Sequence, residues 1–280
     1  MKKLLPLILL AFAFSACQKV EKPNVVAQLL NQGWTLTGDT LNINMQVDVP
    51  SVVQQSLYEN GLIPHPYLGT VENDLLWISD HPWDYTLRFD VDKELFEKQM
   101  VELEFEGIDT YAEVKLNGED LFFANNQFRT WKHDVKDLLK KRDNLLEVHF
   151  PRYDSLQLAL YEQHQPLLPE KYAVSRKAPY QHGWDWAPKY KNVGIWKRVE
   201  LLGWSDAKLQ NAYVVTKNVD NEKATMRLCL DVESEAEGNY VVEIYVNGEK
   251  NSEKTIRLNG GSQNESLNFE IEKPELWWPN

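Results

Sequence analysis

The feature that most limits the fold of this 280-residue chain is an alternation of apolar and polar residues with a period of two. Successive side chains of a β-strand point to opposite faces, so this pattern predicts half-buried strands. The clearest runs are residues 100–105, 112–116, 145–150 and 196–202. Asn117-Gly118 and Asn247-Gly248 each follow such a run and predict tight hairpin turns. We therefore expect an all-β protein.

Two short segments with helical character interrupt these strands. Residues 51–57 begin with Ser51, a residue type that caps helices, and residues 134–141 form the second segment. Residues 153–188 differ from both, because they lack a clean periodicity and contain four prolines. Long irregular segments in compact domains usually carry function. We therefore expect a functional loop in residues 153–188.

The character of the sequence changes after Trp204. Five short alternating runs follow at close spacing, in residues 213–216, 225–232, 240–246, 254–258 and 267–271. Short strands at this spacing are typical of an immunoglobulin-like sandwich, which needs about seven strands. We therefore expect residues 205–280 to form an incomplete immunoglobulin-like β-sandwich, and the chain to be the front of a longer protein.

The N-terminal residues have the pattern of an export signal. Lys2 and Lys3 precede an apolar stretch over residues 4–14, which is too short to span a bilayer as a stable helix. Ser15-Ala16-Cys17 then resembles a bacterial lipobox, in which the cysteine is acylated. We expect residues 1–17 to be a lipoprotein signal peptide with Cys17 as the lipidation site, and residues 18–24 to be a linker. The protein is then exported to the bacterial periplasm or outer membrane and contacts the membrane only through its lipid anchor.

Several classes of function are disfavoured by composition. The net charge of −12 argues against nucleic acid, which needs a basic patch. The six histidines are scattered without ligand spacing, and the chain has no phosphate-cradling glycine loop, so we expect no metal and no cofactor. Asn264-Glu265 resembles the pair that carries the acid/base carboxylate of some glycosidases. It lies between a Gly260-Gly261 turn and a predicted strand, so we interpret it as an exposed hairpin residue pair.

The run Gly183-Trp184-Asp185-Trp186 places a carboxylate between two indoles. Indole faces stack on the C–H faces of sugar rings, and a carboxylate accepts hydrogen bonds from sugar hydroxyls. The run therefore fits a loop that binds a pyranose. Taken alone, it fits a packing role better, because aromatic residues mostly fill cores and Asp185 can satisfy nearby backbone N–H groups.

An ordered series of motifs adds to this reading. The motifs are Val49-Pro50-Ser51, Pro66-Tyr67, Trp77-Ile78, Trp83-Asp84-Tyr85, Gly107-Ile108-Asp109-Thr110-Tyr111-Ala112, Leu116-Asn117-Gly118, Asn126-Gln127-Phe128-Arg129, Arg176-Lys177, Gly183-Trp184-Asp185-Trp186, Gly194-Ile195-Trp196 and Leu276-Trp277-Trp278-Pro279-Asn280. Together they resemble the N-terminal part of the β-mannosidase branch of glycoside hydrolase family 2. The resemblance covers nearly all of residues 25–280.

This resemblance implies a jelly-roll-like, galactose-binding-like sandwich over residues 25–204, then the immunoglobulin-like sandwich, then a catalytic (β/α)₈ barrel C-terminal to this chain. Enzymes of the family release terminal β-D-mannose from oligosaccharides with retention of configuration, which needs two carboxylates about 5 Å apart. In this family both are glutamates of the barrel. No catalytic residue is therefore expected within the 280 residues, and the chain by itself should be inactive.

The resemblance also assigns roles within the loop. It implies that Trp184 and Asp185 bind the substrate, with Asp185 accepting hydrogen bonds from the terminal mannose and Trp184 forming a wall of the pocket. Trp186 is expected to anchor the loop. Family members commonly have Phe where His182 stands and Gly where Ala187 stands, so the loop geometry is expected to differ in detail.

Two other interpretations remain open. One keeps the enzyme class but changes the sugar to a galactoside, glucuronide or glucosaminide. The other is a non-catalytic carbohydrate-binding lipoprotein. A panel of aryl glycosides separates the first interpretation from a mannosidase, and calorimetry of this chain with manno-oligosaccharides tests the second.

Overall fold

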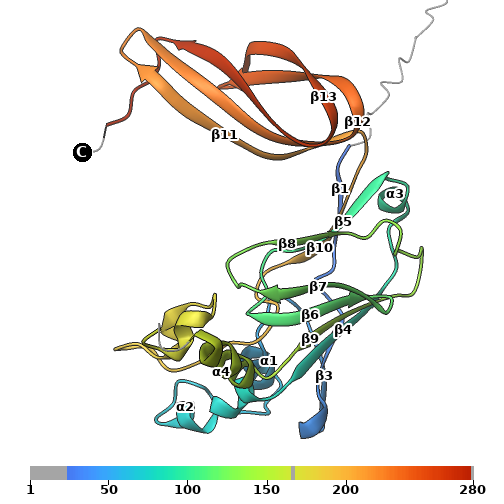
Figure 1. Ribbon diagram of the computed structural model, residues 1–280, viewed down its shortest axis with the longest axis vertical. Coiled ribbons are helices and arrows are strands. Elements are labelled where there is room, and N and C mark those ends of the chain that lie inside the picture. The colour runs from blue at the N-terminus through green and yellow to red at the C-terminus, as the bar shows by residue number, and fades with distance from the viewer. Residues whose placement is uncertain (1–23, 165–167, 279–280) are drawn as a thin grey trace, which may run out of the picture.

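A β-sandwich makes up the first part of the computed structural model, which describes residues 24–164 and 168–278 (Figure 1). One antiparallel sheet has the strand order β3-β2-β4-β9-β6-β7, and the other has the order β1-β10-β5-β8. The strands are β1 Val26–Leu29, β2 Trp34–Gly38, β3 Ile43–Val47, β4 Trp83–Phe89, β5 Met100–Phe105, β6 Tyr111–Leu116, β7 Glu119–Asn125, β8 Trp131–Asp134, β9 Asn144–Phe150 and β10 Val199–Trp204. The predicted all-β class is confirmed.

Both sheets contribute to one apolar core, which explains the period-two pattern. Strand β9 alternates buried and half-buried residues along its whole length, because one of its faces packs against this core. The largest fully buried side chains among the described residues are Trp34, Trp83, Trp204, Tyr85, Phe105 and Phe150. Four of the ten tryptophans, the three above and Trp131, are therefore buried, and they are separate from those of the 183–186 run.

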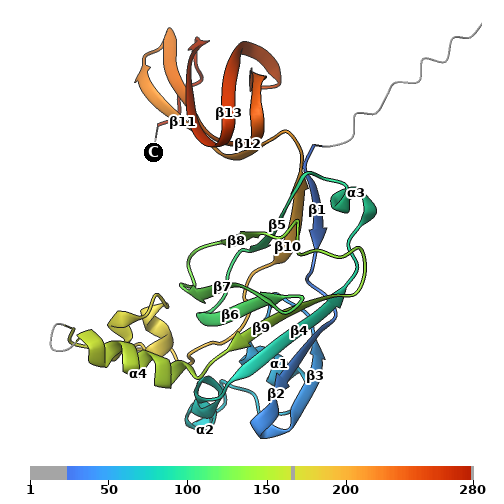
Figure 2. The same cartoon turned by 45° about the vertical axis from the view of Figure 1, so that its right-hand side comes forward.

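The helices α1, α2 and α4 gather at one end of this sandwich, away from the C-terminal sheet (Figures 1 and 2). Their bounds are α1 Val53–Glu59, α2 Val71–Asp74 and α4 Tyr153–His164, and a further short helix is α3 Lys93–Phe96. Short 3₁₀ helices lie at η1 Asp39–Leu41, η2 Leu76–Asp80, η3 Lys171–Val174 and η4 Pro179–His182. The segment that carries the Trp-Asp-Trp run follows α4 at this end, drawn in yellow.

The C-terminal part is a strongly curved three-stranded antiparallel sheet of β11 Ala207–Val219, β12 Lys223–Val246 and β13 Glu249–Glu272. The sequence predicts five short strands here, but β12 and β13 each run through two of them. The register shifts between Ser234 and Glu237, and Gly261 opposite Ser234 has a φ of 74°. This irregularity bends the long strands, so that both halves of each strand pack against one small core. The polar residues at the bend resemble turn residues, which is why the sequence predicts two short strands in place of each long one.

The predicted helix over residues 134–141 is wrong. Asp134 ends β8, and only a single turn follows, in which the N–H groups of Leu138 and Leu139 donate to the carbonyl of Val135. The Lys136 ammonium donates to the Phe96 carbonyl, which holds this turn against α3. The Asn144 side chain accepts the Lys140 N–H at 2.9 Å and donates to the Lys140 carbonyl at 2.7 Å, so these backbone groups do not continue a helix.

The predicted signal peptide, its lipidation site Cys17 and all of the 18–24 linker except Asn24 lie outside the described residues. Within the described ranges, no helix has the length and apolar character needed to cross a membrane. These N-terminal features therefore stay predictions.

Candidate functional site

The Trp-Asp-Trp run forms an exposed tight turn. Trp184 and Ala187 exchange backbone N–H to carbonyl hydrogen bonds, each of 3.4 Å, which places Asp185 and Trp186 at the tip. The Trp184 side chain is 57% exposed and that of Trp186 is 83% exposed. The expected anchoring role of Trp186 is therefore wrong within this chain, because the hydrogen-bonded turn projects its indole outward.

Asp185 lies at this tip with an exposed carboxylate. Within the described part of the chain, its side chain makes no hydrogen bond or ion pair. A packing role would require Asp185 to satisfy nearby backbone N–H groups, and this contact is not formed. The carboxylate is therefore available to a ligand.

An open hollow of about 700 Å³ lies against this turn. Its opposite wall comes from Pro66 and Tyr67, in the connection between α1 and α2, and from Glu72 of α2. The Lys189 backbone N–H donates to the Glu72 carboxylate at 2.8 Å, and the Tyr190 hydroxyl donates to the Pro66 carbonyl. These contacts join two segments that are more than one hundred residues apart in the sequence.

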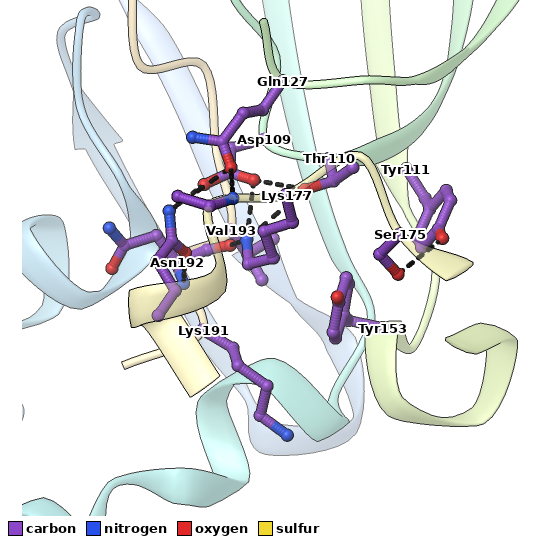
Figure 3. Close-up of polar contacts among 12 residues, drawn as sticks. Asp109, Thr110, Tyr111, Gln127, Tyr153, Ser175, Lys177, Lys191, Asn192 and Val193 are labelled. Atoms are coloured by element: carbon purple, nitrogen blue, oxygen red, sulfur yellow. Dashed lines mark hydrogen bonds and ion pairs between the residues drawn. The ribbon is translucent and has the colours of Figure 1, made fainter. Parts of the chain in front are cut away.

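A buried ion pair connects the segments that precede and follow the turn (Figure 3). The Lys177 ammonium lies 2.6 Å from the Asp109 carboxylate, and the two side chains are 0% and 2% exposed. The same ammonium donates to the Asn192 carbonyl at 2.6 Å and to the Thr110 hydroxyl at 3.4 Å, so its three donors are all used. Burial lowers the pKa of Lys177, while the charge of Asp109 and its hydrogen bond to the ammonium oppose this shift.

Two buried glutamines extend this support on either side of the turn. Gln181 donates to the second Asp109 oxygen at 3.0 Å and accepts the Asn192 N–H at 2.8 Å. Gln127 accepts the Ala178 N–H at 2.7 Å. The chain just before the turn and the chain just after it are therefore tied to the same carboxylate. This arrangement fixes the base of the loop and leaves its tip exposed.

His182 directly precedes the turn and packs beside Tyr153. Its Nε2 lies 3.0 Å from the Tyr153 hydroxyl and 3.1 Å from the Gln157 amide nitrogen. Burial, together with the positive charges of Lys177 and Lys191, lowers the pKa of the His182 imidazole to about 4. The ring is therefore neutral at physiological pH, and its Nε2 accepts hydrogen bonds.

This shifted pKa predicts a pH dependence of stability. The unfolded chain protonates His182 below its ordinary pKa of 6.5, whereas the folded chain does so only near 4. The unfolded state binds more protons in that window, so the free energy of unfolding falls as the pH falls from about 6.5 to about 4. We expect His182→Phe to remove about one proton from the uptake on unfolding near pH 5, measured by urea denaturation across this range. His164→Phe, at an exposed position on α4, is the control, and an unchanged pH profile in His182→Phe would contradict the assignment.

The structure brings together the two predicted substrate-binding residues, Trp184 and Asp185, at one exposed tip beside a hollow. Asp109 and Lys177 belong to two of the motifs that carry the resemblance, but nothing in the sequence indicates that the two side chains pair or that they support this turn. Glu72 belongs to none of those motifs. No group of three or more His, Cys, Asp or Glu residues in the described ranges could hold a metal ion.

Two antiparallel sheets over one core define a β-sandwich, and one end of it carries an exposed aromatic and acidic loop. The chain belongs to the glycosyl hydrolase 2 galactose-binding domain-like family, whose model matches residues 34–197. This match covers more than half of the chain.

Known relatives agree with this assignment. β-Mannosidase B of Emericella nidulans is 30% identical over 277 residues, which cover 90% of this chain and 31% of that protein. The crystal structure of β-D-mannosidase from Dictyoglomus thermophilum has a TM-score of 0.77 at 32% identity and covers 91% of this chain and 32% of that one. An exo-chitosanase of Amycolatopsis orientalis, at 20% identity and a TM-score of 0.65 over 91% of this chain and 30% of its own, shares the fold. The chain thus resembles the N-terminal portion of β-mannosidases and spans about a third of their length.

Proposed function

We propose that this chain is the N-terminal part of an exported, retaining β-mannosidase that releases terminal β-D-mannose from oligosaccharides. In this proposal the chain supplies a scaffold and one wall of the substrate pocket. The observation that carries it is the exposed carboxylate of Asp185, which has no partner among the described residues and stands between two exposed indoles beside an open hollow.

The chemistry of the tip suits a terminal sugar. The Asp185 carboxylate accepts hydrogen bonds from two neighbouring hydroxyls, and these charge-assisted bonds are about twice as strong as neutral ones. The Trp184 indole offers an apolar face to the C–H groups of the ring. The buried Lys177–Asp109 pair holds the loop so that both groups reach the sugar together.

The bond-breaking groups come from outside this chain in the proposal. Retention of configuration needs one carboxylate as nucleophile and another as acid/base, about 5 Å apart. A (β/α)₈ barrel C-terminal to residue 280 would carry both, which accords with relatives about three times as long as the match. The 280-residue chain alone is then inactive.

The remaining parts of the proposal concern the domain organisation. They are the signal peptide 1–17 with acylated Cys17, the linker 18–24, the sandwich 25–204 and the domain 205–280.

Hydrolysis of a panel of aryl β-glycosides by the full-length protein tests the proposal. We expect the β-mannoside to be cleaved at least about 100-fold more efficiently than the galactoside, glucuronide or glucosaminide, because the pocket groups match the hydroxyl arrangement of one sugar. We expect NMR to detect β-mannose as the first product, and the 280-residue chain to release no aryl alcohol. Preference for another glycoside would favour a different family 2 enzyme. Micromolar binding of manno-oligosaccharides by the 280-residue chain alone, without hydrolysis by the full-length protein, would favour a carbohydrate-binding lipoprotein.

A further inference from the structure

A second cleft lies beside the hollow of the Trp-Asp-Trp turn. It has a volume of about 330 Å³ and shares Pro66 and Tyr67 with that hollow. This volume lies within the range of small-molecule sites, which begins at about 300 Å³. The two spaces are therefore neighbouring compartments with a common wall.

Four rings in edge-to-face contact line this second cleft. The ring centroids of Tyr58 and His65 are 5.2 Å apart at an interplanar angle of 80°, and those of His65 and Tyr67 are 6.0 Å apart. Tyr67 and Tyr190 continue the series at 6.0 Å and 87°. These contacts fix the orientation of the rings, yet the Tyr67 side chain remains 72% exposed and that of Tyr58 is exposed as well. The cleft therefore offers preformed aromatic surface to a ligand.

The polar groups of the cleft are available to a ligand. The Tyr58 and Tyr67 hydroxyls and the Asn192 side-chain amide have no hydrogen-bond partner among the residues that the structure describes. The Tyr67 N–H donates to His65 Nδ1 at 3.2 Å, and His65 Nε2 has no partner in the described part of the chain. No Asp, Glu, Lys or Arg is among the described residues that line the cleft. Its chemistry suits an uncharged polyhydroxyl ligand rather than a uronic acid or an amino sugar.

We propose that this cleft binds the sugar next to the terminal one, on the far side of the bond that is cleaved. The inference rests on the proposed function, because the hollow at Asp185 must hold the terminal mannose. Tyr67, as the shared wall, lies where the two sugars join. The substrate is then a neutral β-manno-oligosaccharide of at least two sugars, recognised through aromatic surface and hydroxyl contacts.

Chain-length dependence of hydrolysis by the full-length protein tests this site. The readout is the ratio of kcat/KM for a β-linked mannotriose to kcat/KM for methyl β-D-mannoside, whose methyl aglycone is too small to fill the cleft. Tyr58→Ala removes a ring that lies outside the Asp185 hollow, so we expect this ratio to fall about three- to tenfold, as is typical of one aromatic contact. Tyr58→Phe keeps the ring and should keep the ratio within about twofold. Asn192→Ala should lower the ratio independently, because it removes only an unpartnered amide.

Phe128→Ala is the matched control, because Phe128 is an exposed aromatic residue outside both spaces and should leave both substrates unaffected. Thermal unfolding checks that each variant is folded. An unchanged ratio in folded Tyr58→Ala and Asn192→Ala, or an equal loss for both substrates, overturns the second sugar site. Methyl β-D-mannoside reports on the Asp185 hollow, so either result leaves the proposed function to be judged by that substrate and by Asp185 variants.

Discussion

Replacing Asp185 with alanine is expected to lower kcat/KM of the full-length protein for an aryl β-mannoside by at least about 100-fold, roughly 3 kcal/mol. A carboxylate in a closed pocket makes charge-assisted hydrogen bonds with sugar hydroxyls, and these bonds strengthen where water is excluded. Alanine leaves the same hydroxyls desolvated and without a partner, which adds to the loss. Steady-state kinetics of the purified variant measure the effect.

This variant separates binding from folding cleanly. Because the Asp185 side chain has no partner among the described residues, Asp185→Ala should unfold at the wild-type urea concentration. Asp185→Asn should retain part of the activity, since its amide oxygen still accepts a hydrogen bond. Asp137→Ala is the control, because Asp137 is exposed, unpartnered among the described residues and remote from the turn. A folded Asp185→Ala protein that loses less than about tenfold would remove the role assigned to this carboxylate.

The second large effect concerns the buried pair behind the loop. Lys177→Met leaves the Asp109 carboxylate buried without its counter-ion. Asp109→Asn likewise leaves the Lys177 ammonium buried without its counter-ion. Each single change should lower the free energy of unfolding by about 3 kcal/mol, measured by urea denaturation. The double variant replaces both charges with neutral groups of similar size, so we expect it to be more stable than either single variant. Strict additivity of the two losses would mean that the pair is not coupled.

A surface pair provides the comparison for this experiment. Arg88 and Asp143 lie 2.7 Å apart, but both side chains are largely exposed. Exposed pairs contribute less than about 1 kcal/mol, so Arg88→Met should change stability only slightly. Tryptophan fluorescence of the folded Lys177 and Asp109 variants, each compared with the same variant lacking Trp184 and Trp186, adds a local readout at the turn that this pair supports. Similar losses at the surface pair and the buried pair would argue against a special role for burial.

The strands of the first sandwich were largely predictable, because period-two alternation is a local signal. The run 100–105 coincides with β5, and the run 145–150 lies within β9. The prediction failed where neighbouring elements decide the outcome. Residues 134–141 have helical character, yet they form only one turn, because the Asn144 side chain binds the backbone groups of Lys140. In the C-terminal sheet, a bulge joins pairs of predicted strands into β12 and β13.

The residues of the candidate site also separate into those with a local sequence signal and those without one. Trp184 and Asp185 could be found because their chemistry lies within four consecutive residues. Lys177 and Asp109 could not be paired from the sequence, since 68 residues separate them and neither belongs to a ligand-like pattern. The expected anchoring role of Trp186 was wrong because a two-residue turn directs its side chain outward.

The sequence by itself determined the β class of this protein and the sugar-compatible chemistry of one loop. Both depend on residues that are close together in the chain, where alternation and side-chain type act directly. Only the tertiary structure decided that the Asp185 carboxylate is exposed and unpartnered, that Pro66, Tyr67 and Glu72 face it across a hollow, and that a buried ion pair fixes the loop. Those properties depend on which distant segments contact each other in the folded chain, and the packing of the whole sandwich determines those contacts.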